Sequence, residues 1–199
     1  MLCEIQIKRL SGMETRPAVR VLAQGMADNP LHIAALGSDR ARRIEVLGLM
    51  FKALLEDSSR EILGACWGSE LVGALGYTRG FACRPQVRDL VKFAPALVAS
   101  NVRAPAMAWW LTLWLRHDPP VPHSHLGPVA VTPEARGRGV GAALMHKYVQ
   151  LLDKTGEVGH LETDSVQNLE FYRRFGFQVF RYQKVLNVPN WFMIRNTVT

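Results

Sequence analysis

Residues 126–144, LGPVAVTPEARGRGVGAAL, place an apolar run, a glycine-rich loop and a helical pattern in direct succession. A strand is predicted over residues 125–131, and from Val140 onward apolar residues recur at helical spacing. The loop from Arg136 to Ala142 therefore precedes the first turn of a helix, where unpaired amides and the helix dipole favour an anion. Because glycine has no Cβ, the main chain can approach that anion closely, so the sequence predicts a phosphate-binding loop.

The spacing of this loop separates the kinds of phosphate site. A Walker loop needs Gly-Lys followed by Ser or Thr, and the sequence contains no such triplet. A dinucleotide fingerprint is met superficially by Gly137, Gly139 and Ala142, with Glu162 as a ribose ligand. However, residues 132–136 separate the strand from the first glycine, whereas the fingerprint places that glycine at the end of the strand. A dinucleotide site is therefore disfavoured.

The stretch at residues 126–144 resembles the signature of the GNAT superfamily of N-acetyltransferases. The core of that signature is Gln or Arg, any two residues, Gly, any one residue, and Gly or Ala. In the family this segment binds the pyrophosphate of coenzyme A. Arg136, Gly139 and Gly141 occupy the fixed positions. A second block, NLEFYRRFGF at residues 168–177, resembles the family's Tyr-x-x-x-Gly-Phe helix. Two blocks in this order make the resemblance specific.

This resemblance implies a fold and a co-substrate. The fold is an α/β domain of the GNAT acyl-CoA N-acyltransferase type, with a mixed, mostly antiparallel, splayed sheet flanked by helices. The co-substrate is acetyl-CoA, whose pantetheine arm fills the gap between two splayed strands of the family. The residues implied to bind it are Val129, Ala130, Val131, Arg136, Gly137, Arg138, Gly139, Val140, Gly141, Ala142, Asn168 and Tyr172. Pro128 supports a gap here, because proline lacks the N–H that a neighbouring strand would accept.

Direct transfer from a thioester to an amine needs a polarised carbonyl, a deprotonated amine and a protonated leaving thiolate. The resemblance implies that the amide of Val129 polarises the carbonyl and that Tyr172 is the general acid. Many relatives carry a glutamate where this chain has His125, whose neutral imidazole can accept a proton near pH 7. Glu162, on the facing strand, is the second candidate base and would act through a water.

The activity implied is transfer of an acetyl group from acetyl-CoA directly to a primary amine. The acceptor, a small molecule or a peptide, is not identified by the sequence. The alternative is a non-catalytic acyl-CoA-binding sensor or regulatory module on the same fold. Acetyl-CoA should stabilise both, but only an enzyme releases free thiol when the right amine is added.

Histidines cluster before the strand at residues 125–131. His123 and His125, with His117 and Asp118 upstream, offer ligand atoms for a metal. Because three or more converging ligands are not apparent from the sequence, we expect no metal.

The remaining chain is predicted as one domain over residues 1–199, with an acetyl-CoA-binding core at about 124–180. The predicted elements are a strand at 5–7, a helix at 15–26, a helix after Ser38 that includes 44–55, and a hairpin of 61–67 with 70–77. They continue with helices at 89–99 and 104–116, a strand at 158–163, a helix capped by Ser165 that runs to Phe175, and strands at 177–185 and 191–195.

Residues 80–123 form a helical insertion without a family counterpart. Trp110 and Trp114 are one turn apart on its second predicted helix, which also carries Trp109. Bulky aromatic residues at this spacing form a core stripe more often than a substrate wall. We nevertheless expect the insertion to cover the acceptor entrance and to determine specificity, because long connections are often binding elements.

The composition describes an ordinary globular protein of 199 residues, with 48% apolar and 21% charged residues. The net charge of +7 favours an anionic partner, but no recognition-helix signature or compact Lys/Arg block indicates a nucleic acid. The most apolar stretch, residues 104–115, is shorter than the ~20 residues of a membrane span. We therefore expect a cytoplasmic protein without membrane contact; a homodimer is left open. The sequence has three cysteines, Cys3, Cys66 and Cys83, and their spacing indicates no disulfide framework, which also fits a reducing compartment.

Overall fold

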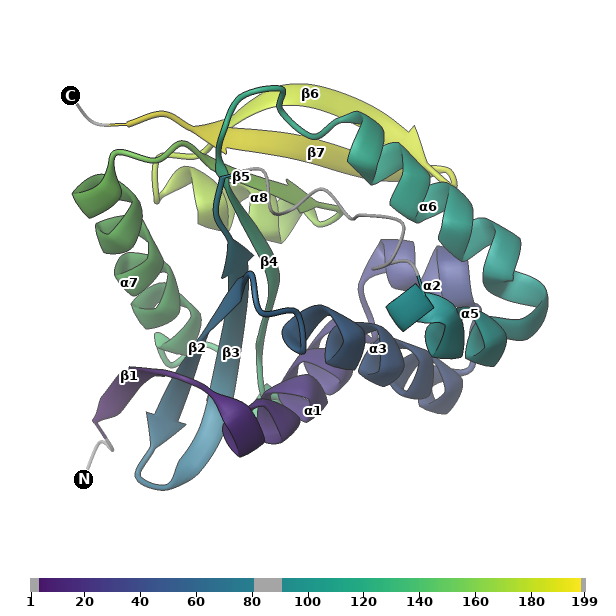
Figure 1. Ribbon diagram of the computed structural model, residues 1–199, viewed down its shortest axis with the longest axis horizontal. Helices are drawn as coiled ribbons and strands as arrows, with labels where there is room; N and C mark the ends of the chain where they lie inside the picture. The colour runs from purple at the N-terminus through teal and green to yellow at the C-terminus, as the bar shows by residue number, and fades with distance from the viewer. Residues whose placement is uncertain (1–3, 81–90, 198–199) are drawn as a thin grey trace.

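The computed structural model describes residues 4–80 and 91–197. Within these residues seven strands form one sheet in the order β1-β2-β3-β4-β5-β7-β6 (Figure 1). The strands are β1 (Ile5–Arg9), β2 (Arg60–Trp67), β3 (Glu70–Thr78), β4 (Ser124–Val131), β5 (Gly159–Thr163), β6 (Gln178–Val185) and β7 (Val188–Arg195). Neighbouring strands are antiparallel except β4 and β5, which are parallel. The predicted mixed, mostly antiparallel sheet is confirmed.

The sheet opens between β4 and β5. These strands pair over two rungs, Ser124 with Gly159 and His125 with His160. Beyond the rungs, β4 continues along β3 and β5 continues along β7, so the two strands diverge. The register of β3 against β4 also shifts between Leu75 and Tyr77, opposite Pro128. The interruption predicted from the missing proline N–H is confirmed.

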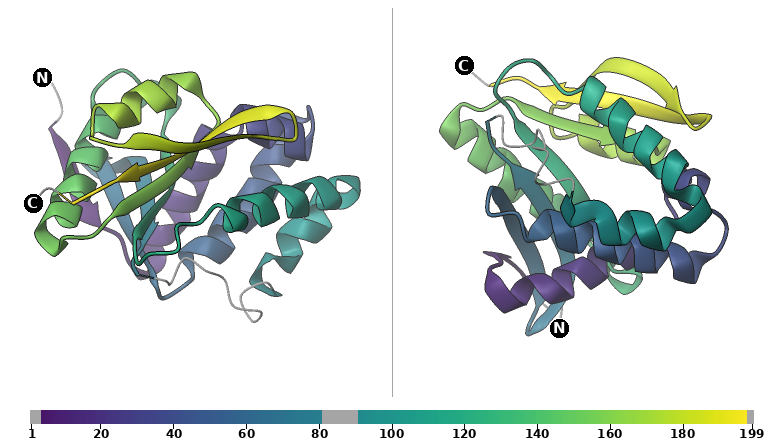
Figure 2. Two further views of the ribbon diagram at one scale, coloured as in Figure 1. Left: turned by 90° about the horizontal axis from the view of Figure 1, so that it is seen from above. Right: turned by 45° about the vertical axis from the view of Figure 1, so that its right-hand side comes forward.

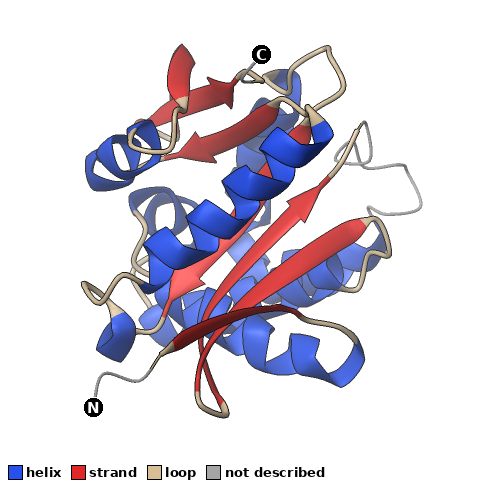
Figure 3. Cartoon of the chain, turned by 90° about the vertical axis from the view of Figure 1, so that its left-hand side faces the viewer, coloured by secondary structure: helices blue, strands red, loops and turns tan. Residues whose placement is uncertain are grey.

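Helices cover both faces of the sheet. They are α1 (Thr15–Met26), α2 (Pro30–Leu36), α3 (Arg40–Leu55), α5 (Ala94–Ser100), α6 (Ala104–Arg116), α7 (Val140–Thr155) and α8 (Val166–Arg173). One core joins α1, α2, α3, α5 and α6, and a second joins α7 and α8 with the other face of the sheet. Figure 3 views the molecule from the side of α7, which lies across the strands.

Helix α6 lies beside the hairpin of β6 and β7, as both views in Figure 2 show. Trp114 Nε1 donates a hydrogen bond of 3.1 Å to Asn190 Oδ1, and the ring of His117 packs on Phe192 at 4.6 Å between centroids. These two contacts attach the insertion to β7, which lies next to β5 in the sheet. None of the described helices is long and apolar enough to cross a bilayer.

Several predicted boundaries are wrong. The short helix α2 was not predicted, because seven residues show too little periodicity. The N-cap of α3 is Asp39, whose carboxylate accepts the amide of Arg42, in place of the expected Ser38. Helix α5 begins at Ala94 because a proline at the next position is tolerated only in the first turn.

The earlier start predicted for α5 includes residues 89 and 90, which lie outside the described residues, as do Cys3 and Cys83. Cys66 is a buried free thiol. Strand β7 begins at Val188, before the predicted Trp191. Pro189 fits there because the pairing with β5 ends at Trp191, so no strand on that side needs its N–H.

Candidate active site

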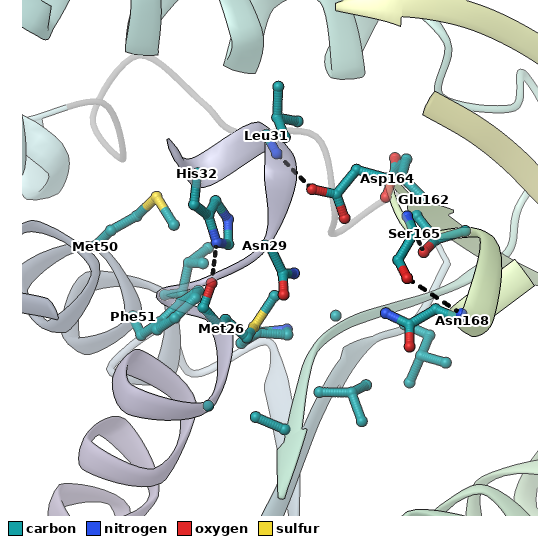
Figure 4. A pocket seen from close by; sticks show the side chains of 18 of the residues that line it. Met26, Asn29, Leu31, His32, Met50, Phe51, Glu162, Asp164, Ser165 and Asn168 are labelled. Atoms are coloured by element: carbon teal, nitrogen blue, oxygen red, sulfur yellow. Dashed lines mark hydrogen bonds between the residues drawn. The ribbon is translucent and has the colours of Figure 1, made fainter. Parts of the chain in front are cut away.

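A cavity of about 1270 Å³ lies where β4 and β5 diverge. One wall comes from β4 and the loop before α7, and another from β5 and α8. Helices α1, α2, α3 and α6 complete it with largely apolar side chains, including Met26, Leu31, Met50, Phe51, Leu54, Trp110, Leu111 and Trp114. Figure 4 shows the α1–α2 side, with Met26 and His32, opposite the β5–α8 side, with Asp164 and Asn168.

The glycine-rich loop has the local geometry predicted for an anion site. Gly137 and Gly139 have φ of +72° and +82°, a left-handed conformation that side chains with a Cβ rarely adopt. Gly139 is the N-cap of α7, so the first amides of a 16-residue helix face outward at this point. Arg136 Nη2 is 3.2 Å from the Gly25 carbonyl, and the guanidinium of Arg138 lies over the Trp67 ring at 5.4 Å.

The cavity collects the residues that the sequence singled out for acyl-CoA binding. Its lining includes Val129, Ala130, Val131, Arg136, Gly137, Gly139, Val140, Gly141, Ala142, Asn168 and Tyr172. The side chain of Arg138 instead packs on Trp67. Ser165 is the N-cap of α8 and accepts the amide of Asn168 at 3.5 Å. The side chain of Asn168 faces the cavity in Figure 4.

Tyr172 lines the cavity from α8 and is only 8% exposed. Phe171 and Phe177 pack against its ring at 5.4 and 6.3 Å between centroids. Burial raises the pKa of the Tyr172 hydroxyl above its usual value, and the negative charge of Asp164 acts in the same direction. The phenol therefore keeps its proton at neutral pH and can donate it or share it.

His125 and Glu162 meet across the diverging strands. His125 Nε2 is 2.9 Å from Glu162 Oε2, and both side chains line the cavity. Burial opposes ionisation of Glu162, but the charge of His125 and its hydrogen bond outweigh burial and hold the carboxyl pKa below its usual value. An ionised Glu162 accepts the N–H at Nε2, so a neutral His125 carries its lone pair at Nδ1.

His160, which sequence reasoning missed, joins this pair. It is fully buried on β5, and burial lowers its pKa to about 3, so the imidazole stays neutral. Its ring lies 5.0 Å from that of His125 and 5.3 Å from that of His123. Asp118 Oδ1 lies 3.1 Å from His123 Nε2 and 3.7 Å from His125 Nδ1. The available signal was the alternation of His160 and Glu162, which places both on one face of a strand.

The tryptophans of α6 have three different environments. Trp110 is a core residue, 1% exposed, whose ring stacks edge-on against Trp114 at 5.3 Å. Trp114 is half-buried and lines the cavity, whereas Trp109 is 50% exposed. The core stripe predicted for this helix is present at Trp110, which also borders the cavity together with Trp114, whereas a substrate wall stays a prediction.

Comparison with known proteins agrees with this architecture. Residues 34–177 match the model of the acetyltransferase (GNAT) family. A structure described as histone acetyltransferase HPA2 and related acetyltransferase, from Corynebacterium glutamicum, is 22% identical with a TM-score of 0.74, and the match covers 98% of this chain and 97% of that one.

Two further solved structures are similar in fold. The PaiA N-acetyltransferase of Thermoplasma acidophilum, in complex with coenzyme A, is 14% identical with a TM-score of 0.60, over 97% of this chain and 99% of that one. A ribosomal-protein-alanine N-acetyltransferase of Escherichia coli is 10% identical with a TM-score of 0.59, over 98% and 96%. With the family model matching most of its length, the chain belongs to the GNAT acetyltransferase family.

Proposed function

We propose that this protein transfers the acetyl group of acetyl-CoA directly to a primary amine. The observation that carries the proposal is the divergence of β4 and β5 into a cavity that also contains the N-terminus of α7, Tyr172 and the His125–Glu162 pair. Binding of the thioester, activation of the amine and protonation of the thiolate each then have a candidate group in one space.

The phosphate end of acetyl-CoA would bind at the loop from Arg136 to Ala142. The outward amides of the first turn of α7 and the positive end of its dipole favour the pyrophosphate there. The pantetheine arm would lie along Val129 to Val131, where β4 has no rung with β5. The amide of Val129 would then donate to the thioester carbonyl and stabilise the negative charge that develops on its oxygen.

The reaction forms a C–N bond and breaks the C–S bond at the carbonyl carbon. The His125–Glu162 pair would accept the proton that the amine loses, directly or through a water, with Glu162 stabilising the resulting imidazolium. Tyr172 would give its proton to the departing thiolate of coenzyme A. Each proton therefore has a donor or an acceptor among side chains that line the cavity.

The acceptor would approach from the side of α3 and α6. Leu54, Leu111 and Trp114 line the cavity there, and Asp118 lines it near His125. This wall favours an amine that carries an apolar group, because burial of that group stabilises the complex by about 25 cal/mol per Å².

A thiol-release screen with acetyl-CoA tests the proposal. Small amines, amino acids, polyamines, aminoglycosides and peptides with free N-termini are offered in turn, and amines of graded apolar size follow within the class that responds. Release of coenzyme A together with a product heavier by one acetyl group supports an N-acetyltransferase. Thermal stabilisation by acetyl-CoA with no thiol release from any amine would favour the non-catalytic sensor.

A further inference from the structure

Three side chains of the kinds that bind metals, two histidines and one glutamate, converge at the last rung that joins β4 to β5. His125 and His160 are register partners on that rung, and Glu162 follows His160 by two residues on the same face of β5. One nitrogen or oxygen atom from each of the three lies within 4.8 Å of the other two. We expected no metal from the sequence because only His117, Asp118, His123 and His125 were candidate ligands. The fold adds His160, which pairs with His125 across the two strands.

Two of these side chains hold polar atoms that the protein leaves unsatisfied. Neither ring nitrogen of the fully buried His160 has a hydrogen-bond partner among the residues that the structure describes, and the same holds for Glu162 Oε1. His160 Nε2 and Glu162 Oε1 are 3.8 Å apart. A buried donor or acceptor without a partner costs about 1–3 kcal/mol, so a group that contacts both atoms would recover much of that cost.

We propose that His125, His160 and Glu162 bind a divalent transition metal ion of the Zn²⁺ class. Two imidazoles and one carboxylate suit Zn²⁺ and its neighbours in the first transition row, whereas Mg²⁺ and Ca²⁺ prefer oxygen ligands alone. Three protein ligands leave a fourth position for a water or another small ligand.

The surroundings supply the outer contacts and the access that such a site needs. Asp118 Oδ1 lies 3.7 Å from His125 Nδ1, on the opposite side of the ring from Glu162, where a carboxylate orients a ligating histidine. His125 and Glu162 both line the large cavity, so an ion can enter from solvent. The second candidate triad, Asp118 with His123 and His125, is less suitable because Asp118 and His123 already contact each other at 3.1 Å.

The ion would act as an inhibitor of acetyl transfer, and this part of the inference rests on the proposed function. A metal bound through His125 Nε2 and Glu162 leaves the ring proton of His125 on Nδ1, so the ring no longer offers the lone pair that would accept the proton of the amine. Metal release would restore the base without any change of fold. The site would thus couple acetyl transfer to the free concentration of the ion.

Metal binding by the full chain is the first test. The protein is stripped with a chelator, dialysed, and titrated with Zn²⁺ in competition with a chromophoric indicator; Co²⁺ is titrated separately and followed by its visible absorption. We expect one ion per chain and a Co²⁺ spectrum with d–d bands typical of a nitrogen and oxygen site. Absence of stoichiometric binding would overturn the inference and would leave the proposed acetyl transfer unaffected.

Matched variants locate the ion. His160→Gln and Glu162→Gln should each weaken Zn²⁺ binding at least ~10-fold, since even outer contacts of metal sites are worth about 10–100-fold. His146→Gln removes an exposed histidine of α7 that packs on Phe175, and should leave the affinity unchanged. Acetyl-CoA-induced thermal stabilisation verifies that each variant is folded. Equal affinity in parent and His160→Gln proteins would overturn the assignment.

The inhibitory effect is tested with the amine that the screen identifies. Acetylated product is quantified by mass spectrometry, because Zn²⁺ also binds the thiol that a colorimetric assay detects. Zn²⁺ should inhibit the parent enzyme reversibly, and His160→Gln should require at least ~10-fold more Zn²⁺ for the same fractional inhibition. Stoichiometric binding without inhibition would overturn the regulatory role.

Discussion

The amide of Leu31 donates a hydrogen bond of 2.7 Å to Asp164 Oδ2, across 133 positions of sequence. Leu31 lies in the first turn of α2 and Asp164 directly follows β5, so this bond joins the two sides of the cavity shown in Figure 4. His32, the next residue of α2, is buried against Trp110 at 5.1 Å and contacts the Met26 carbonyl through Nδ1 at 2.7 Å. The cavity wall therefore contains a titratable group at a point where the two sides meet.

His32 should make the stability of the protein depend on pH. Burial lowers its folded-state pKa and outweighs the opposing hydrogen bond to Met26 and the charge of Asp164, while the charge of Arg43 lowers the pKa further. Below the unfolded value of about 6.5 the unfolded chain binds more protons, so stability is lost as the pH falls through that value. Denaturant unfolding at about pH 7.5 and pH 5 measures the loss, and His32→Gln should reduce it by up to about 2 kcal/mol. An equal loss in both proteins would contradict this effect of burial.

Replacing Tyr172 by Phe should lower turnover about 10²–10⁴-fold and leave the acetyl-CoA affinity nearly unchanged. The change removes only the hydroxyl that would protonate the thiolate, and the ring contacts with Phe171 and Phe177 are kept. Tyr148→Phe is the matched control, because Tyr148 is also buried and its hydroxyl bonds to Ser124. It should cost about 1 kcal/mol of stability and no turnover. Unchanged turnover in Tyr172→Phe would remove this residue from the chemistry.

His125→Ala should remove the ascending limb of the pH–rate profile. If the His125–Glu162 pair is the base, the rate of the parent protein should rise with pH as the pair loses its proton, since only the unprotonated pair could accept one from the amine. Rates are measured with a chelator present, so that no metal ion occupies the pair. His146→Ala, a change at the surface of α7, should keep the parental profile. A parental profile in His125→Ala would assign the base to another group or to solvent.

Alanine substitutions of the two glycines at the start of α7, Gly139 and Gly141, should have different effects on acetyl-CoA binding. Gly139 has φ of +82°, so a Cβ there costs roughly 1–2 kcal/mol and shifts the loop that would hold the pyrophosphate. A Cβ at Gly141 would make ordinary contacts of 3.6 Å with Phe171 and 3.7 Å with Val131. Calorimetric titration should therefore show acetyl-CoA binding weakened by Gly139→Ala and nearly unaffected by Gly141→Ala. The reverse order would refute the placement of the pyrophosphate.

The tryptophans of α6 provide a test of acceptor specificity. Trp114→Ala removes part of the cavity wall and should raise the KM for an apolar amine several-fold, with little change in the Kd of acetyl-CoA. Trp109→Ala, on the same helix but half exposed, should change neither constant. If Trp114→Ala weakened both ligands together, the insertion would contribute to the core and not to acceptor choice.

The parts of this fold that follow from local chemistry could be predicted from the sequence. Glycines beside Arg136 and a proline in β4 indicated a loop and an open sheet, and both are present. Boundaries that depend on one cap were harder to predict, as at the start of α3, because Ser38 and Asp39 are both favourable N-cap residues and only the structure shows that Asp39 accepts the amide of Arg42. His160 was missed because its position beside His125 depends on a register between strands 35 positions apart, and the alternation of His160 and Glu162 within β5 does not encode that register.

The short ladder between β4 and β5 divides the sheet into two halves. Four strands lie on one side of the two rungs and three on the other, and each side has its own strand hydrogen bonds. Because strand hydrogen bonds join the halves only at Ser124 and His125, other contacts must hold them together, and these include the core that α7 shares with both halves and the Leu31–Asp164 bond. The width of the cleft between Val131 and Thr163 is therefore set by side-chain packing across the gap and not by the backbone ladder.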